Sequence, residues 1–410
     1  MSGESRSISV QCCIAGGGPA GMMLGYLMAR AGVRTLVLEK HADFLRDFRG
    51  DTVHPSTLQA MVDLGLIDAF LKRPHSKLTQ LGGEIDGVVL TIVDLSHLPV
   101  DCPFVVFMPQ WEFLNFLAEE GRKLPALQVM MQAEATGLIR VGERVVGVQV
   151  ATPDGTLEVR ADLTVGADGR GSILRDRAGL KVQDLGAPMD VFWFRLSRDP
   201  ADYDQLLARV NDGHFMVTID RGDYWQCAYI IPKGGAEAAR AEGIAAFRTK
   251  VAEAAPFLSP KTSELGSFDD IKLLTVAVDR LERWSMPGLL FIGDAAHAMS
   301  PIGGVGINLA IQDAIEAANI LAAPLAVGEA ITARRLDSVR RRRMLPTRII
   351  QAFQVLVQDR VLKPGLGGVG TARIDPRPIQ FIAKVPLLQQ LAARMIGLGV
   401  RMERVKSPRA

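Results

Sequence analysis

Residues 9–39 read SVQCCIAGGGPAGMMLGYLMARAGVRTLVLE, and this stretch decides the fold. Residues 9–15 are mostly apolar and β-compatible, as is typical of a buried parallel strand. A glycine-rich turn follows at residues 16–21, and the Met-, Leu- and Ala-rich residues 22–31 favour a helix. Gly32 ends that helix, and residues 33–38 form a second apolar run with Glu39 at its end. The stretch therefore predicts a strand, a helix and a second strand in one βαβ unit.

The turn between the first strand and the helix matches the pattern Gly-x-Gly-x-x-Gly through Gly16, Gly18 and Gly21. We expect Gly16 to allow a tight turn, Gly18 to let the backbone approach a pyrophosphate, and Gly21 to let helix and strand pack closely. The helix N-terminus then offers free N–H groups to phosphates, and Glu39 can accept hydrogen bonds from a ribose. We interpret the turn as a dinucleotide site; the alternative is a glycine turn with a structural role only.

A second copy of the glycine pattern stands at residues 365–370, but its surroundings differ. No convincing strand leads into it, Pro364 lies directly before it, and residues 373–376 do not open a clean helix. The pattern alone is weak evidence without a strand before it and a helix after it. We therefore predict a loop at residues 365–370.

The charge balance of the chain argues against a nucleic-acid partner. It has 47 Lys and Arg against 45 Asp and Glu, which gives a formal net charge of +2. The charge is uneven, because residues 331–410 hold 17 basic and 4 acidic side chains. One hypothesis is a weak contact between this basic region and an anionic membrane surface or an acidic partner. The alternative is a solvated face of helices.

Cysteine usage and the N-terminus indicate a cytoplasmic protein. Cys12, Cys13, Cys102 and Cys227 are scattered, with neither metal-ligand nor Cys-x-x-Cys spacing, so we expect reduced, mostly buried thiols and no metal site. Residues 1–9 are polar and lack the apolar core of a signal peptide. No run of about 18 uncharged apolar residues predicts a membrane span.

Two further strands are predicted to deliver an acid to the start of a helix. Residues 163–166 are an apolar strand followed by Asp168 and Gly169. Residues 289–292 are another strand, followed by Asp294 and then by a small-residue loop with glycines at 303, 304 and 306. Such tips face ligands in open α/β sheets, and the backbone N–H groups of the glycines can face a planar, electron-rich ring.

The middle of the chain has a different pattern. Short β runs at residues 191–196, 214–219 and 224–231 are separated by turns, a helix is expected at 243–254, and a strand at 271–278. These runs predict an antiparallel sheet that roofs a ligand cavity. Residues 331–357 and 385–399 are predicted to be helical. His297 is interpreted as a residue that orders its loop rather than as a general base.

Taken together, these motifs resemble the flavoprotein monooxygenases of the para-hydroxybenzoate hydroxylase type, the single-component aromatic hydroxylases. The resemblance covers roughly residues 8–345 and extends more diffusely to hydroxylases of ubiquinone biosynthesis. It implies FAD as the cofactor and assigns residues to it by motif. By this resemblance, the pyrophosphate loop is Gly16, Gly18, Pro19, Ala20 and Gly21, and the ribose acid is Glu39, with Lys40 beside it. Arg49 and Gln110 lie near the ADP and ribityl parts, Asp168 and Gly169 serve FAD and a passing NAD(P)H, and Asp294 binds the ribityl chain. The turn against the isoalloxazine ring contains Pro301, Gly303, Gly304, Val305, Gly306 and Asn308.

The resemblance also implies a reaction. NADPH or NADH, visiting transiently, reduces FAD; O2 then gives a flavin hydroperoxide that hydroxylates an aromatic, quinone-like or polyketide-like small molecule. A flavin-dependent reductase or dehydrogenase on the same fold, and a non-catalytic FAD-binding accessory protein, remain alternatives. No catalytic residue and no oligomeric state follow from the sequence.

The expected fold class is α/β. A Rossmann-like FAD-binding domain, interleaved with an antiparallel-sheet substrate domain, precedes a helical C-terminal region. We place the FAD-binding parts at residues 1–75, 104–180 and 281–345, the substrate-domain parts at 76–103 and 181–280, and the helical region at 346–410.

Overall fold

The computed structural model describes residues 6–45, 52–200, 202, 207–211, 213–363, 380 and 384–410. Its largest sheet has the strand order β19-β20-β11-β1-β2-β8, with the hairpin of β9 and β10 attached to β11. The strands are β1 (Arg6–Ala15), β2 (Thr35–Leu38), β8 (Leu127–Met130), β9 (Glu134–Val141), β10 (Arg144–Thr152), β11 (Gly155–Gly166), β19 (Ser285–Met286) and β20 (Leu289–Phe291). Because β20, β11, β1, β2 and β8 pair in parallel, their carboxyl ends lie at one edge.

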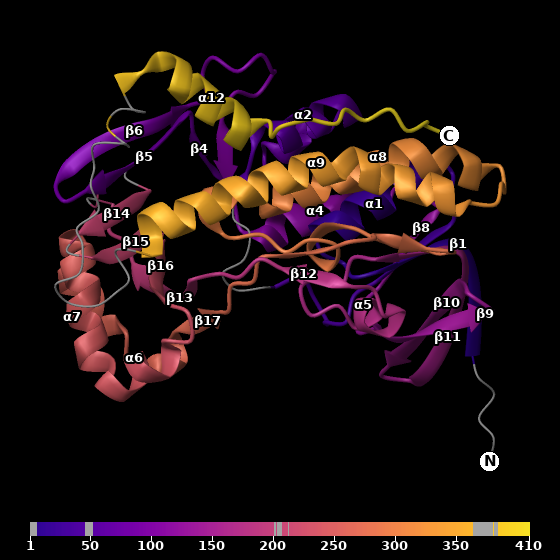
Figure 1. The fold of residues 1–410 in the computed structure, drawn as a ribbon, viewed down its shortest axis with the longest axis horizontal. Helices are drawn as coiled ribbons and strands as arrows, with labels where there is room; N and C mark the ends of the chain where they lie inside the picture. The colour runs from indigo at the N-terminus through magenta and orange to yellow at the C-terminus, as the bar shows by residue number, and fades with distance from the viewer. Residues whose placement is uncertain are drawn as a thin grey trace.

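Helices pack against this sheet, and α1 (Pro19–Arg30) contacts β1, β2 and β8. A Cβ at Gly25 of α1 would stand 2.6 Å from the side chain of Val37 in β2, so the helix and the sheet touch there. Helix α1 also contacts α4 (Gln110–Gly121) and α8 (Gly306–Ala326), and α8 runs beside α9 (Ala333–Val357) (Figure 1). The βαβ unit predicted from residues 9–39 is confirmed.

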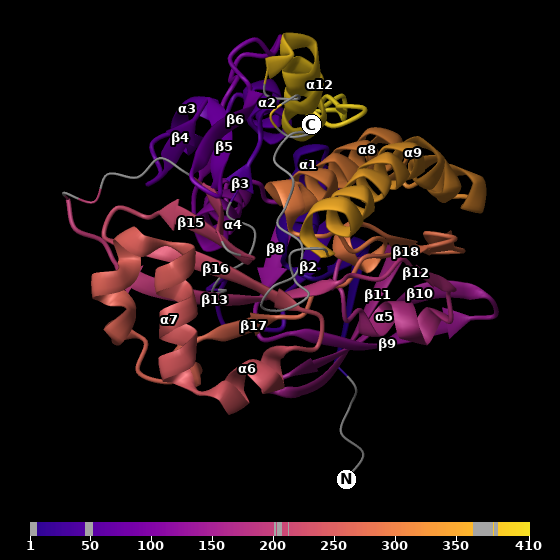
Figure 2. The ribbon, with the colours of Figure 1, turned by 60° about the vertical axis from the view of Figure 1, so that its left-hand side comes forward.

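A second, seven-stranded sheet has the order β17-β13-β16-β15-β14-β5-β6. Its strands are β5 (Gln80–Ile85), β6 (Val88–Asp94), β13 (Met189–Ser197), β14 (Ala208–Asn211), β15 (His214–Asp220), β16 (Tyr224–Pro232) and β17 (Lys272–Leu274). Alternate side chains serve opposite faces: Phe192 and Phe194 pack with Phe247 of α7 (Ile244–Ala254), whereas Val191 packs toward Ile302. Figure 2 shows α6 (Ala236–Glu242) and α7 beside this sheet.

The remaining elements connect these layers. A small sheet joins β3 (Thr52–Val53), β7 (Val105–Phe107) and β4 (Ser76–Leu78), and β12 (Val182–Asp184) pairs with β18 (Asp279–Leu281). The helices α2 (Pro55–Leu64), α3 (Ile67–Phe70) and α5 (Ile173–Ala178) are short, and α12 (Pro386–Gly397) contacts β6. Single turns of 3-10 helix occur at Phe268–Asp270, Gly293–Ala295 and Ile302–Gly304; a longer one spans Pro256–Glu264, and a π-turn spans Gln358–Leu362.

The α/β fold class and the interleaving of the two sheets are confirmed, with several local differences. The seven-stranded sheet is antiparallel except that β14 and β5 pair in parallel. The strand predicted at 271–278 is only Lys272–Leu274, and the helix α6 and the long 3-10 segment were not predicted. The second glycine pattern, at 365–370, lies outside the described residues. The domain boundaries remain a prediction.

The helical segment Ile302–Ala326, which includes α8, is long and apolar enough to cross a membrane by length and composition alone. However, 67% of its apolar window is buried inside the protein, as expected for the central helix of a core. All four cysteines are free and buried, in agreement with the sequence.

Candidate active site

Three strand ends meet at one edge of the parallel sheet. Pairing aligns Ala15 of β1 with Gly166 of β11, and Gly166 with Phe291 of β20. The N–H of Ala167 donates to the carbonyl of Ala15 at 2.8 Å, and the N–H of Ile292 donates to the carbonyl of Gly166 at 3.1 Å. The loops that carry Gly16, Asp168 and Asp294 therefore start side by side, which is where open α/β sheets bind ligands.

The glycine loop after β1 is shaped by close contacts. Gly16 has a φ of +109°, and a Cβ there would collide with the carbonyl of Ala167. The side chain of Glu39 lies beneath the loop, only 6% exposed, and accepts hydrogen bonds from the N–H groups of Gly17 at 3.1 Å and His41 at 3.0 Å. A carboxylate oxygen can accept more than one bond, so these contacts fix Glu39 and leave it able to bind a hydroxyl.

Gly18, Pro19 and Ala20 open helix α1. A Cβ at Gly18 would meet no protein atom within 4 Å, so the backbone there faces open space. The first N–H groups of an α-helix have no partner within the helix, and together with the helix dipole they attract phosphates. This arrangement fits a pyrophosphate at the predicted position.

Asp168 organises the start of α5. Its carboxylate accepts hydrogen bonds from the hydroxyl of Ser172 at 2.5 Å and from the N–H of Leu174 at 3.2 Å. Burial raises the pKa of Asp168 above its usual value, although these two hydrogen bonds oppose the shift. The side chain thus holds the loop containing Gly169 in place; a direct contact with a cofactor stays a prediction.

Asp294 lies at the tip after β20 and forms an ion pair that was not predicted from the sequence. The Nε of Arg170 stands 3.1 Å from the Asp294 carboxylate, and both side chains are about one-third exposed. Arg170 also donates to the carbonyls of Thr275 at 3.4 Å and Met299 at 3.5 Å. Arg170 therefore links the loop that carries Asp168 to the loop that carries Asp294. Its position two residues after Asp168, in a glycine loop at a strand end, was the available signal.

The turn before α8 is fastened to the segment that leads into α2. The hydroxyl of Thr52 donates to the carbonyl of Gly304 at 2.9 Å, and a Cβ at Gly304, whose φ is +62°, would collide with Thr52. Asn308 is 3% exposed; its carbonyl oxygen accepts from the N–H of His54 at 2.9 Å and the hydroxyl of Thr57 at 2.7 Å. The Asn308 side chain holds the turn, so its cofactor contact remains a prediction, as do those of Pro301, Gly303, Val305 and Gly306.

His54, which precedes α2, predicts a pH dependence of stability. The residue is 1% exposed, and its Nδ1 lies 2.8 Å from the carbonyl of Ile396, so Nδ1 carries the proton. Burial lowers the pKa of His54 to about 4.

We expect His54 to favour the folded state above about pH 6.5, the pKa of an unfolded histidine, and to lose this contribution as the pH falls toward 4. The free energy of unfolding should fall by up to about 3 kcal/mol over that window because of this residue. Denaturant unfolding of wild type and of His54→Gln at several pH values measures it. Equal pH dependence in both proteins would contradict the prediction.

Two predicted residues, Lys40 and Gln110, form no hydrogen bond with the three tips among the residues that the structure describes. Lys40 is exposed, with its ammonium 3.9 Å from Glu134. Gln110 begins α4 and is half-buried. Arg49 lies outside the described residues. Within the described part of the chain, no group of three or more His, Cys, Asp or Glu could hold a metal.

His297 agrees with its interpretation as a residue that orders its loop. Its Nε2 lies 2.6 Å from Asp313 of α8, and both side chains are buried. Asp313 also accepts the N–H of Gly293 at 3.1 Å, so it supports the third tip from behind. In the sequence, Asp313 is an ordinary residue of an apolar helix, and no local pattern marks it as part of the site.

Comparison with known proteins bears directly on the site. The family model described as FAD binding domain matches residues 9–352. The chain is 32% identical to the 6-methylpretetramide 4-monooxygenase of Streptomyces rimosus over 96% of this chain and 94% of that protein. Among solved structures, p-nitrophenol 4-monooxygenase from Pseudomonas putida DLL-E4 superposes with a TM-score of 0.80 at 20% identity, over 97% of this chain and all of that one. OxyS anhydrotetracycline hydroxylase from Streptomyces rimosus gives a TM-score of 0.74 at 23% identity, over 97% of this chain and 77% of that one.

The family match spans most of the chain, including all three strand tips, and the identity to one relative extends over nearly its full length. The chain therefore binds FAD and belongs to the FAD-binding-domain family of FAD-dependent monooxygenases, the aromatic hydroxylases of the para-hydroxybenzoate hydroxylase type.

Proposed function

We propose that this monooxygenase hydroxylates an aromatic polyketide, with FAD held across the three strand tips. The main support is that Gly16–Gly18, Asp168 and Asp294 converge at one edge of the sheet. The chain is also 32% identical to a 6-methylpretetramide 4-monooxygenase over 96% of its length. FAD would supply the redox chemistry with O2, and the protein supplies position, fixed dipoles and exclusion of water.

The geometry of the loops supports the following contacts with FAD. The N–H groups at Gly18, Ala20 and Gly21 would bind the pyrophosphate, the fixed carboxylate of Glu39 the ribose, and Asp294 the ribityl chain. The turn from Pro301 to Gly306 would lie along the ring, where the start of α8 favours negative charge.

The substrate would lie between this turn and the seven-stranded sheet. One face of that sheet carries Val191, Phe215 and Ala228, and it packs toward Ile302 in the turn. These side chains are apolar, so this wall favours a hydrophobic aromatic compound over a strongly charged one.

The test is oxygen transfer. Purified holoprotein is given NADPH or NADH, isotopically labelled O2 and a panel of phenols, quinols and aromatic polyketides. We expect a product that carries one labelled oxygen, with flavin reduction fastest for the correct substrate. Oxidation of NAD(P)H with a product lacking that oxygen would instead support a reductase or dehydrogenase.

Asp294 can be tested separately through cofactor affinity. We expect Asp294→Ala to weaken FAD binding about 10- to 100-fold, because a hydrogen bond to a charged group is worth about 1.5–3 kcal/mol. Arg170→Met removes the same ion pair but keeps the carboxylate, so it should retain FAD much better. Titration of both apoproteins with FAD measures this. Equal losses would mean that only the Arg170–Asp294 pair matters.

The cytoplasmic location and the membrane contact also belong to the proposal. Four buried free thiols support a reducing compartment. Many basic side chains after residue 331 are paired within the protein, which favours the alternative to membrane binding: Arg335 with Glu329, Arg340 with Asp337, Arg342 with Glu403, Arg343 with Asp313, and Arg404 with Asp63. Binding of the full chain to anionic vesicles at low salt would restore the membrane hypothesis.

A further inference from the structure

A fully buried group of charges lies directly behind the tip that carries Asp294. At its centre is Asp313 of α8, with a side chain that has no exposed surface. One carboxylate oxygen accepts from the N–H of Gly293 at 3.1 Å and from Nε2 of His297 at 2.6 Å. The other accepts from Nε of Arg343 at 3.0 Å. One carboxylate thus ties both ends of the loop 293–297 to α8 and α9.

Asp313 is held in its ionised form. Burial by itself would raise its pKa, but the contacts with His297 and Arg343 outweigh burial and hold the pKa of Asp313 below its usual value. Hydrogen bonds to an ionised acceptor are short and strong, so the three donors are held in place. The position of Gly293 therefore depends on the position of Asp313.

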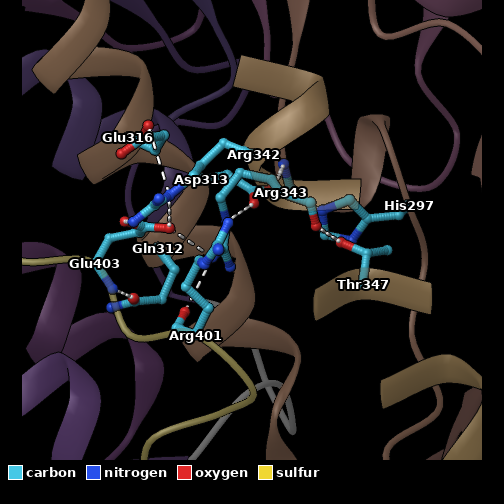
Figure 3. A network of polar contacts seen from close by, with 10 residues as sticks. His297, Gln312, Asp313, Glu316, Arg342, Arg343, Thr347, Arg401 and Glu403 are labelled. Atoms are coloured by element: carbon cyan, nitrogen blue, oxygen red, sulfur yellow. Dashed lines mark hydrogen bonds and ion pairs between the residues drawn. The ribbon is translucent and has the colours of Figure 1, made fainter. Parts of the chain in front are cut away.

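Arg343 connects Asp313 to the end of the chain. Its Nη1 donates to the carbonyl of Arg401 at 3.2 Å and stands 3.4 Å from the carboxylate of Glu403. Glu403 also accepts two hydrogen bonds from Arg342, each 2.9 Å, and its N–H donates to the side chain of Gln312. Figure 3 shows Arg343 between Asp313 and Glu403, with His297 at the right of the view.

The C-terminal tail, residues 400–410, is fixed along its length. Arg404 forms an ion pair with Asp63 of α2, and the N–H of Lys406 donates to Asn319 of α8 at 2.7 Å. The N–H of Ala410 donates to the carbonyl of Arg30, at the end of α1, at 2.9 Å. The tail crosses the helical face of the FAD-binding sheet (Figure 1), and Glu403 is the point where it reaches inward.

We propose that the C-terminal tail is a strap that sets the position of the Gly293–Asp294 tip, with Glu403, Arg343 and Asp313 as positioning residues. The inference rests on the proposed contact between Asp294 and FAD. Space at the tip is tight: a Cβ at Gly293 would stand 3.1 Å from Ala20 and 3.3 Å from Ala310. A shift of Asp313 therefore moves the tip against α1 and α8 rather than into free space.

The matched pair Glu403→Gln and Glu316→Gln tests the strap. Both carboxylates lie near Arg342, Glu316 at 4.0 Å and Glu403 at 2.9 Å, but only Glu403 has an ion pair with Arg343. We expect Glu403→Gln to weaken FAD binding about tenfold and to change the visible circular dichroism of bound FAD, while Glu316→Gln resembles wild type. Glu403→Asp, which keeps the charge, should lie between wild type and Glu403→Gln.

The measurements are FAD titrations of the apoproteins, visible circular dichroism of the holoproteins, and melting of both forms. Loss of thermal stability in Glu403→Gln with unchanged FAD affinity and spectrum would overturn the proposal, because the tail would then only stabilise the fold. An equal loss of affinity in Glu316→Gln would overturn it too. None of these readouts needs turnover, so a wild type that binds FAD but forms no hydroxylated product would refute the proposed function alone.

Discussion

Replacing Gly21 with alanine will give a protein that binds FAD on the order of 100-fold more weakly than wild type. A Cβ at Gly21 would collide with the carbonyl oxygen of Gly16 and lie 3.3 Å from the side chain of Ile14. The carbonyl is backbone at the end of β1, so relief requires the whole glycine loop to move. Displacing two N–H donors from a charged pyrophosphate, each worth about 1.5 kcal/mol, gives this factor.

Gly18→Ala is the matched control, because its effect should have a different cause. A Cβ at Gly18 meets no protein atom within 4 Å, and its φ of −73° suits alanine. We expect the Gly18→Ala apoprotein to melt as wild type does, yet to bind FAD poorly, because the new methyl group occupies the space left for the pyrophosphate. Gly21→Ala should lower both the melting temperature and the affinity.

The measurements are FAD titration and melting of the apoproteins. If Gly18→Ala binds FAD as tightly as wild type, the pyrophosphate does not lie against this loop. If Gly21→Ala is also unaffected, the glycine turn has no role in cofactor binding, and the site must be sought elsewhere.

The parts of the site that the sequence could predict are those built from short, local patterns. The glycine loop at 16–21, Asp168 and Asp294 each follow an apolar strand directly, and parallel strands place their carboxyl ends at one edge. The order of motifs along the chain is therefore enough to bring these residues together.

Other parts of the site and fold could not be predicted from the sequence, because they depend on pairs of residues that are far apart in the chain. Asp313, Arg343 and Glu403 each look like an ordinary charge, and only folding brings them within hydrogen-bond distance. Likewise Arg170 and Asp294 are 124 positions apart. In β14 and β5 the parallel pairing depends on the path of the chain, which side-chain alternation does not reveal. Local patterns thus predict elements and tips, but not the ion pairs that link them.

Arg343→Met will be among the most destabilising single substitutions in this protein. Arg343 is 1% exposed and lies between two carboxylates that are also buried, Asp313 at 0% and Glu403 at 4%. Methionine fills similar apolar volume but leaves the carboxylate of Asp313 with only His297 and the N–H of Gly293. Breaking a buried ion pair by removing one partner costs about 3–5 kcal/mol of unfolding free energy.

Arg342→Met is the control for this substitution, because the Arg342 side chain is 40% exposed and Glu403 keeps Arg343 without it. We expect it to cost at most about 1 kcal/mol, because a partly exposed arginine stays solvated and gains little from its ion pair. Denaturant unfolding of the holoproteins at fixed FAD concentration compares the two. Similar losses for both arginines would show that burial does not determine the cost.

A double-mutant cycle with Asp313→Asn separates the ion pair from simple packing. If the pair is what matters, Asp313→Asn/Arg343→Met should lose less stability than the sum of its two single variants, by about 1–3 kcal/mol, because neither buried charge is then left alone. Agreement with the sum to within about 0.5 kcal/mol would mean that the two side chains act independently. In that case Arg343 could not couple the position of the tail to that of Asp313. The strap proposal would then be contradicted, even if Glu403→Gln weakened FAD binding.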